Sequence, residues 1–355
     1  MSEIERLEVK RYSVHRHNTY LKCPFRFLKQ IIEKVETPQT EPQRLGKSSH
    51  KYLQEYYNLV DTKQLKSLQD EDLFDYIIDL FENTIIPADE MEMDIVPVVT
   101  GFADLECDRI TILQDMNLSQ EEFDKYYLPV FEEREIEFDI EVPVYESRLK
   151  PGTKTVKIKE TIAIVKTKFK MIVDAAFLNL GDDKHITTEW KTGLKHPDFF
   201  AEVNRQLYIY THFLEEQKVK DKHGNKYDGK YLCVVFPRYT HVSFKERRQQ
   251  SETTIMNYLG KALYSIAKGE FDRKPDMVTC GWIKPPEDRC PFYEEYCKEW
   301  LENEGYTKER PESDEDDEID DEWREEDWNE DEKDNKSDQD FSEGSWDTAK
   351  KIGME

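Results

Sequence analysis

The chain has 355 residues, of which 36% are charged and 37% hydrophobic, and it carries a formal net charge of −26. Residues 302–355 hold 24 Asp/Glu against 7 Lys/Arg, a net of −17, which leaves −9 for residues 1–301. Those 301 residues suffice for a buried core, and the lack of an apolar run of about 18 residues or of an apolar signal-peptide core predicts a cytoplasmic protein without a membrane span.

Helical spacing dominates the first third of the chain. Pro24 interrupts an aromatic and basic helical pattern near the N-terminus. In the next helix, Ser48 or Ser49 would cap the first turn and place His50 inside it. Four segments show helical patterns: 11–34, 44–60, 73–81 and 119–132.

From residue 135 the pattern changes to strands. Strands are predicted at 135–146, 155–167, 168–180, 186–193 and 231–238. Turns are predicted at Pro151-Gly152 and at 181–185, and helices at 198–218 and 251–268. This order predicts an α/β fold in which helices flank a mixed β-sheet. The predicted domain, 1–301, has three parts: helices at 11–132, a core at 133–240, and a helix with a cysteine segment at 251–298.

The strands carry the residues best suited to catalysis. Asp174 follows the apolar run Lys170–Val173, and Glu189 and Lys191 lie two apart on the returning strand, so they share a face. A turn at 181–185 would bring the three together. Two carboxylates can hold Mg²⁺, and a lysine can stabilise charge on a phosphate. The competing interpretation is an ordinary surface salt bridge.

Three further residues support that site. Gln206 and Tyr210 lie four apart on the next predicted helix, so they share one face that would look onto the site. The tyrosine would stack on a base, and the glutamine would contact phosphate or Lys191. His50 offers an imidazole that suits transition metals. Simple amphipathic packing and a structural histidine are the alternatives.

Cysteines gather at two places, with Cys23 near the start and Cys280, Cys290 and Cys297 towards the end. Four thiolates suit an iron–sulfur cluster, which would clamp the two ends of the chain. They also suit zinc, or the thiols could be unligated. Cys107 in an apparent loop and Cys233 in a buried strand are expected to fill space.

The acidic segment 302–355 predicts a disordered tail, because it is too charged to bury a core. Its simplest role is solubility. Its aromatic residues leave two other hypotheses, in which the tail covers a DNA groove or binds a basic partner: Trp323, Trp328, Phe341 and Trp346.

Five short motifs in order give the chain a resemblance to the PD-(D/E)XK nuclease superfamily. They are TYLKCPFRF (19–27), GKSSH (46–50), IVDAAF (172–177), TEWKTG (188–193) and QLYIY (206–210). The chain looks most like the RecB-type branch, which includes CRISPR-associated single-strand exonucleases and the nuclease domains of helicase–nuclease complexes. The resemblance implies a restriction-endonuclease-like fold in a bacterial, archaeal or phage-infected cell.

The resemblance also implies residue roles. The metal ligands for Mg²⁺ or Mn²⁺ would be His50, Asp174, Glu189 and the carbonyl of Trp190. Lys191 would be the catalytic lysine, with Gln206 and Tyr210 completing the catalytic set. An acidic residue on an earlier strand can add to such a site, and three are candidates: Glu133, Glu135 and Glu137.

One cysteine before the core and three after it is the arrangement of the iron–sulfur subset of this branch. It implies a 4Fe-4S cluster on Cys23, Cys280, Cys290 and Cys297, with zinc as the alternative. The subset usually shows C-x2-C-x5-C at its C-terminal end, whereas this chain has C-x9-C-x6-C. The longer first gap means that Cys280 departs most from the pattern of this subset.

The expected function is a metal-dependent DNA exonuclease acting on single strands or ends, with a helicase or recombination partner. Alternatives are a catalytically inactive iron–sulfur DNA-binding or scaffold subunit and a zinc-stabilised interaction protein. Basic residues near the expected entrance would track phosphates: Lys10, Arg11, Arg16, Arg26, Lys29 and Lys47. Aromatic residues there would stack bases or pack in the core: Tyr20, Phe25 and Phe27.

Overall fold

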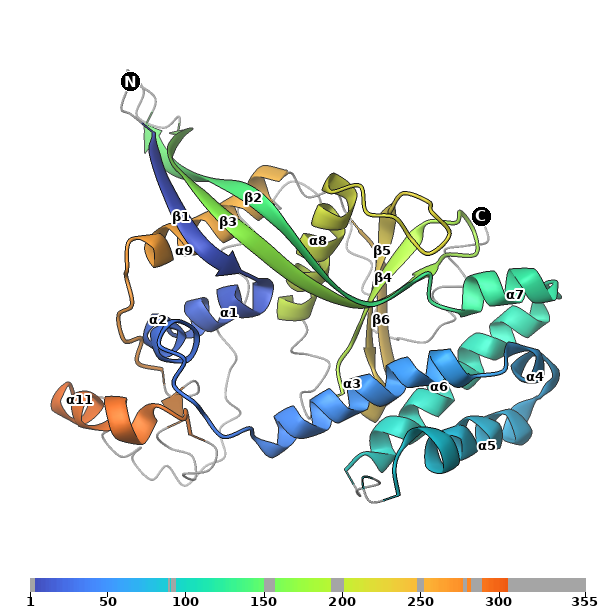
Figure 1. Cartoon of the computed structure of the whole chain (residues 1–355). Helices are drawn as coiled ribbons and strands as arrows, with labels where there is room; N and C mark the ends of the chain where they lie inside the picture. Colours follow the sequence, from blue (N-terminus) through green and yellow to red (C-terminus); the bar gives the residue numbers. More distant parts are fainter. Residues whose placement is uncertain are drawn as a thin grey trace, which may run out of the picture. The chain divides into compact units, whose positions relative to one another are not determined.

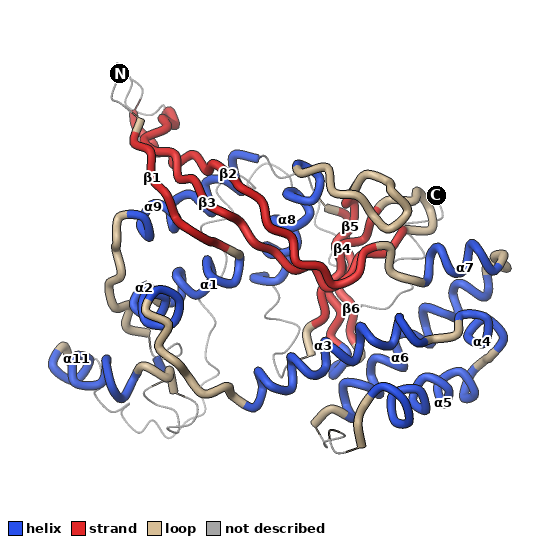
Figure 2. The backbone as a smooth tube through the Cα atoms, viewed as in Figure 1, coloured by secondary structure: helices blue, strands red, loops and turns tan. Residues whose placement is uncertain are grey.

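The computed structural model describes residues 4–88, 90, 94–149, 157–192, 201–247, 252–276, 280–281 and 289–305 (Figures 1 and 2). Its strands are β1 (Glu5–Tyr12), β2 (Phe131–Leu149), β3 (Lys157–Leu178), β4 (His185–Trp190), β5 (Gly229–Phe236) and β6 (His241–Glu246). Its helices are α1 (Val14–Lys22), α2 (Pro24–Phe27), α3 (Glu41–Leu59), α4 (Thr62–Ser67), α5 (Asp70–Leu80), α6 (Val96–Asp115), α7 (Gln120–Tyr127), α8 (Ala201–Glu216), α9 (Glu252–Ala267) and α11 (Lys298–Asn303). Two compact units meet in sequence after Arg273.

The first unit is built on a six-stranded mixed sheet, as predicted. Its order is β1-β3-β4-β5-β6, and β2 pairs with β3. Strands β1 and β3 are parallel, as are β4 and β5, while β2, β4 and β6 run antiparallel to their partners β3, β3 and β5. The predicted α/β class is therefore confirmed.

Strand β3 is long enough to change partner along one edge. Its pairing with β1 ends at Tyr12↔Phe169, and its pairing with β4 begins at Ala175↔Thr188. Residues 170–174 thus pair with β2 alone. The carboxyl ends of β1 and β4 approach this gap from opposite directions, which makes it a topological switch point of the kind where ligands bind in α/β sheets.

The ribbon formed by β2 and β3 corrects the predicted strand boundaries. The two strands predicted at 155–167 and 168–180 are one continuous strand, because β2 pairs with it from Phe131↔Ala176 to Leu149↔Lys157. The turn predicted at Pro151-Gly152 lies outside the described residues. The helix predicted at 119–132 ends at Tyr127, since its last residues already belong to β2.

Helices cover the sheet on both faces. Phe177 and Ile186 join a core with α3, α5, α6 and α7, whereas the adjacent Ala176 joins a core with Phe213 of α8 and with α9. Because neighbouring strand residues point to opposite faces, these cores lie on opposite sides of the sheet. Among the described residues, no helix is both long and apolar enough to cross a bilayer.

Five of the helices and strands were not predicted: β1, α4, α6, β6 and α11. The alternation of Leu7 and Val9 with charged residues is a strand pattern that could have identified β1. In α6, buried residues cover a wide arc of the helix and leave a narrow exposed stripe that includes Asp104, Asp108 and Thr111. The buried arc is broader than the apolar stripe of a typical surface helix, which obscures the helical period. Cys107 consequently lies in α6, and not in a loop.

Helix α3 also begins earlier than predicted. It starts at Glu41, where the Thr40 amide donates to Gln43 Oε1 (3.1 Å). Ser49 is buried in the middle of the helix, so neither Ser48 nor Ser49 caps it. The prediction that His50 lies in the first turn was wrong; it lies mid-helix.

Helix α1 is attached to the sheet through a buried histidine. The Nδ1 atom of His17 lies 2.7 Å from the hydroxyl of Tyr12 at the end of β1. Its ring packs against Tyr258 of α9, with centroids 4.2 Å apart. Burial, and then the nearby Arg205, lowers the pKa of His17 to about 3. The folded protein therefore holds this ring neutral across the mildly acidic range.

We expect His17 to make stability depend on pH. The unfolded histidine has a pKa of about 6.5, so the unfolded state binds more protons between pH 6.5 and 3, and stability falls as pH falls through that window. Between pH 6 and pH 4, the free energy of unfolding of the wild type should fall by roughly 2 kcal/mol more than that of His17→Gln. Urea unfolding at each pH measures the difference; parallel losses in both proteins would contradict it.

Candidate active site

Asp174, Glu189 and Trp190 meet where β3 exchanges β1 for β4. Asp174 lies at the end of the β3 segment that has neither β1 nor β4 beside it, and Glu189 and Trp190 are the last two residues of β4. The Trp190 amide donates to Asp174 Oδ2 at 2.9 Å. This bond replaces a strand-to-strand hydrogen bond by one to a side chain, and it holds the aspartate against the end of β4.

The lysine and glutamine of the predicted site converge on Glu189. Lys191 Nζ donates to Glu189 Oε1 at 2.6 Å, and Gln206 Nε2 of α8 donates to the same oxygen at 2.9 Å. The Lys191 amide continues the ladder to the Val235 carbonyl at 2.8 Å, which fixes the backbone on which both side chains stand. Asp174, Glu189, Lys191 and Gln206 are thus brought together as the sequence predicts.

The electrostatics of the site leave negative charge unsatisfied. Burial, and then Asp174, raises the pKa of Glu189. Burial alone would lower the pKa of Lys191, but Glu189 outweighs it and the net shift is upward. Glu189 Oε2 is buried and has no hydrogen-bond partner among the described residues. A buried oxygen of this kind is costly unless a cation or donor meets it.

His50 approaches the same carboxylates from α3. Its Nδ1 lies 3.5 Å from Asp174 Oδ2, and its ring packs edge-on to Trp190. Burial lowers the pKa of His50, but Asp174 has the opposite effect and the net shift is upward. One turn earlier, the Gly46 carbonyl accepts a hydrogen bond from Thr192 (3.5 Å), so α3 is tied to the chain just beyond Lys191.

Tyr210 reaches the site but not the solvent. It is 6% exposed and lies beside Gln206 and the backbone of Ile172. Burial, followed by Glu189 and Asp174, raises its pKa. A ring so enclosed cannot stack on a base, so that predicted role was wrong; Tyr210 lines the inner wall.

The donor set fits a divalent cation, although the carboxylates are turned towards the protein. In the described part of the chain, no three His, Cys, Asp or Glu side chains are gathered as a ready metal site. Trp190 occupies one oxygen of Asp174, and Lys191 and Gln206 share one of Glu189. The unpartnered Glu189 Oε2 is the observation that favours a cation.

Other predicted residues take other positions. Glu135 pairs with Lys170 (2.5 Å) and Glu137 with Arg11, on the exposed face of the ribbon. Glu133 is also exposed. Glu135 and Glu137 of β2 therefore form ion pairs with basic side chains of β3 and β1, away from Asp174 and Glu189.

Sequence reasoning missed Glu202, which lies one helical turn before Gln206. Its carboxylate accepts hydrogen bonds from Asn18 Nδ2 (2.8 Å) and Lys22 Nζ (2.9 Å) of α1. It also helps raise the pKa of Lys191. The four-residue spacing from Gln206 was the available signal.

The predicted cysteine ligands fall in both units. Cys23 in the first unit caps α2, where its Sγ accepts from the Arg26 amide at 3.4 Å. In the second unit, Cys280, Cys290 and Cys297 belong to one small cluster with Tyr293 and Leu301. The three C-terminal cysteines therefore pack on one apolar cluster, although among the described residues they do not form a ready metal-binding group.

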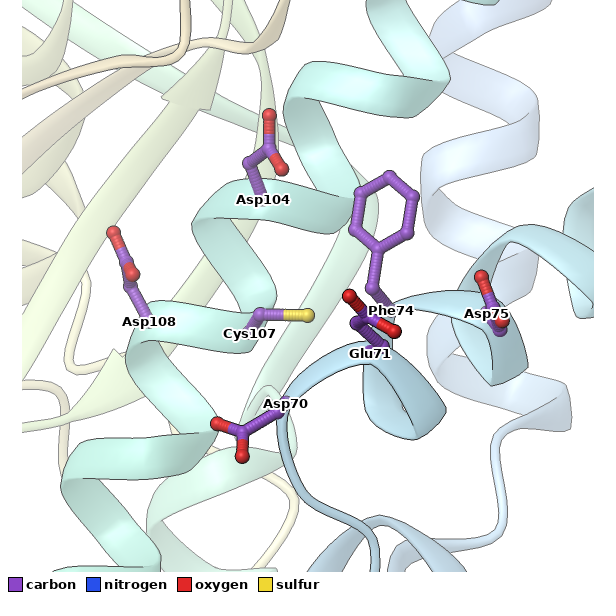
Figure 3. A pocket seen from close by; sticks show the side chains of 7 residues that line it. All are labelled: Asp70, Glu71, Phe74, Asp75, Asp104, Cys107 and Asp108. Atoms are coloured by element: carbon purple, nitrogen blue, oxygen red, sulfur yellow. The ribbon is translucent and has the colours of Figure 1, made fainter.

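A groove between α5 and α6 is separate from these residues (Figure 3). Five carboxylates and Phe74 surround Cys107 there, and burial followed by Glu106 raises the pKa of Cys107 to about 12. The thiol is therefore protonated and unreactive. The groove is lined by Asp70, Glu71, Phe74, Asp75, Asp104, Cys107 and Asp108.

Comparisons with known proteins give one informative match. The sequence matches a family model described as the PD-(D/E)XK nuclease superfamily over residues 11–298. The search of curated proteins found no match. A solved structure titled "Crystal structure of SSO0001" is 14% identical, with coverage of 67% of this chain and 96% of that one, but its TM-score of 0.25 is too low to support an argument.

We expect Mn²⁺ to stabilise the protein after EDTA treatment. A cation that binds only the folded state at 100 times its Kd adds about 2.7 kcal/mol to stability, which thermal unfolding detects as a higher Tm. Asp174→Asn should lose most of the increase, because it removes charge beside Glu189. Glu135→Gln, an exposed control, should keep it. An equal rise in Tm for Asp174→Asn would argue against this site.

Proposed function

The chain belongs to the PD-(D/E)XK nuclease superfamily, and from that premise we propose that it hydrolyses DNA phosphodiester bonds at Asp174, Glu189 and Lys191. The observation that carries the proposal is the convergence of two buried carboxylates and one ammonium at the switch point of the sheet. An inactive scaffold would not need to keep a buried carboxylate oxygen without a partner.

The ligands of Mg²⁺ or Mn²⁺ would be His50, Asp174, Glu189 and the carbonyl of Trp190. A bound divalent ion supplies an activated water and offsets charge that develops on the phosphate.

The remaining roles belong to the protein. Lys191 holds a fixed positive charge beside the reacting phosphate and orients the attacking water, while its contact with Glu189 Oε1 fixes its direction. Gln206 holds that oxygen from the other side. Tyr210 closes the inner wall and keeps bulk water out.

The catalytic carboxylates lie below the protein surface, which favours single strands or strand ends as substrate. The side chains of Glu189 and Asp174 are only 5% and 10% exposed, so a scissile phosphate must enter the site to meet them. A single strand or a free end can do so more easily than a continuous duplex. The chain has no G-x-x-x-x-G-K-[ST] phosphate loop, so a helicase or recombination partner would have to supply unwinding.

The test uses end-labelled single-stranded DNA with Mg²⁺ or Mn²⁺. Lys191→Ala should lower kcat roughly 100-fold to 1000-fold, since it removes one preorganised donor to the transition state, while the exposed Lys63→Ala should cleave like wild type. Circular single strands should survive, because they offer no end. Cleavage of circles would replace exonuclease by endonuclease action, and full activity of Lys191→Ala would refute the catalytic assignment.

We also propose that a 4Fe-4S cluster is held by Cys23, Cys280, Cys290 and Cys297. Support comes from the packing of Cys280, Cys290 and Cys297 on one apolar cluster, from the buried position of Cys23, and from the preference of iron–sulfur clusters for four thiolates. Joining residue 23 to residue 280 would close a loop longer than 250 residues, which is a stabilising constraint on the unfolded chain.

Anaerobically purified protein should be brown, absorb near 400 nm, and contain about four iron and four sulfide per chain. Cys290→Ser should lose this absorbance, whereas Cys107→Ser should keep it. A colourless protein with one zinc per chain would assign zinc to the thiols instead.

A further inference from the structure

Positive charge is concentrated in one segment of this acidic chain. Residues 9–32 contain no Asp or Glu, although acidic residues number 77 in the 355-residue chain. The segment comprises the end of β1 and helices α1 and α2. Its six Lys/Arg residues are Lys10, Arg11, Arg16, Lys22, Arg26 and Lys29. A segment that excludes acids so completely is suited to an anionic ligand.

Four of the basic groups lie close together on α1 and α2. His15 and Lys22 lie seven residues apart on α1, which places them on one side of that helix, and Arg26 lies on α2 beyond the extended Cys23. Burial lowers the pKa of His15, and so do Arg26, Lys22 and Arg16. We call these four residues, His15, Arg16, Lys22 and Arg26, the basic stripe.

The stripe adjoins the candidate active site through one carboxylate. Glu202, in the first turn of α8, binds Lys22 at 2.9 Å and Asn18 at 2.8 Å. Glu202 also acts electrostatically on Lys191, and Gln206, one turn further along α8, contacts Glu189. One helical turn of α8, from Glu202 to Gln206, therefore links the stripe to Glu189.

The two arginines of the stripe bind neutral partners. Arg16 Nη1 donates to the Arg11 carbonyl at 2.7 Å, and Arg26 Nε donates to Gln30 Oε1 at 3.3 Å. These contacts orient the guanidinium groups without neutralising their charge. Guanidinium groups recognise phosphate oxygens in pairs of hydrogen bonds.

Nearby aromatic rings contribute packing and not stacking. Tyr20 and Phe27 are 7% and 1% exposed and lie against Phe271, which favours the core-packing alternative for these two rings. Phe25 lies under the cations of Lys29 and Arg273. The surface therefore offers charge for a backbone and little for base recognition.

We propose that the basic stripe binds the phosphates of the DNA strand that flank the scissile bond, independently of base sequence. This rests on the proposed function and deepens it, because it assigns the path by which the strand enters. Charge complementarity carries the argument, since the chain as a whole repels nucleic acid and must attract it locally.

The test is equilibrium binding of a fluorescent 30-nucleotide single strand to the full chain in EDTA, at a series of salt concentrations. Arg16→Gln/Arg26→Gln should bind roughly 20-fold more weakly at 0.1 M salt, and the slope of log K against log salt should fall by roughly 1.4. The charge-conserving variant Arg16→Lys/Arg26→Lys should recover most of the wild-type affinity and most of the wild-type salt slope. A control double variant of exposed lysines elsewhere, Lys63→Gln/Lys218→Gln, should match wild type.

The possible failures are distinguishable. Wild-type affinity and slope in the Arg-to-Gln variant would overturn the stripe, and so would equal weakening in the control variant. Loss of binding in the Arg-to-Lys variant, with an unchanged Tm, would also overturn it, because charge would then not be the cause. Absence of metal-dependent cleavage by a wild type that binds normally would refute the nuclease and leave the stripe as a DNA-binding surface.

Discussion

The repulsion between Asp174 and Glu189 is the constraint on which the site depends. Two buried carboxylates lie beside the ammonium of Lys191 and the ring of His50, and burial, followed by Asp174, raises the pKa of Glu189. Such an arrangement persists only where the surrounding fold forces it. Here β3 supplies Asp174 at the gap between its two edge partners, and β4 ends where its backbone can bind that aspartate. A bound divalent cation would offset the repulsion between the two carboxylates.

The helical layer supports this geometry from behind. The ring of Trp190 stacks on Tyr57 of α3, with centroids 6.1 Å apart and planes 11° from parallel. Tyr57 donates to Glu106 (2.9 Å), which is paired with the buried Arg109 of α6. The backbone of Trp190 thus binds Asp174, while its ring packs on Tyr57, which in turn is hydrogen-bonded to the buried Glu106–Arg109 pair. Residues that never meet a substrate therefore fix the backbone that holds the carboxylates.

Acidic and basic residues are concentrated in different parts of the chain. Acidic residues dominate the C-terminal segment and the groove between α5 and α6, whereas the segment spanning α1 and α2 excludes them. Glu202 links these two parts, because it pairs with Lys22, accepts a hydrogen bond from Asn18 and helps raise the pKa of Lys191. An acidic protein can in this way keep non-specific nucleic-acid binding low and still present a local path for a phosphate backbone.

Periodicity and short motifs were sufficient to predict a mixed sheet flanked by helices and the meeting of Asp174, Glu189, Lys191 and Gln206, because strand alternation and helical spacing are local properties. The same local signals failed for α6, whose buried arc covers most of the helix, and for the N-terminus of α3. Only the tertiary structure decided that β3 exchanges β1 for β4 beside Asp174, that Tyr210 is enclosed, and that Glu202 ties α1 to the site. Those features depend on contacts between segments far apart in sequence, and no local pattern encodes which distant segments will pack together.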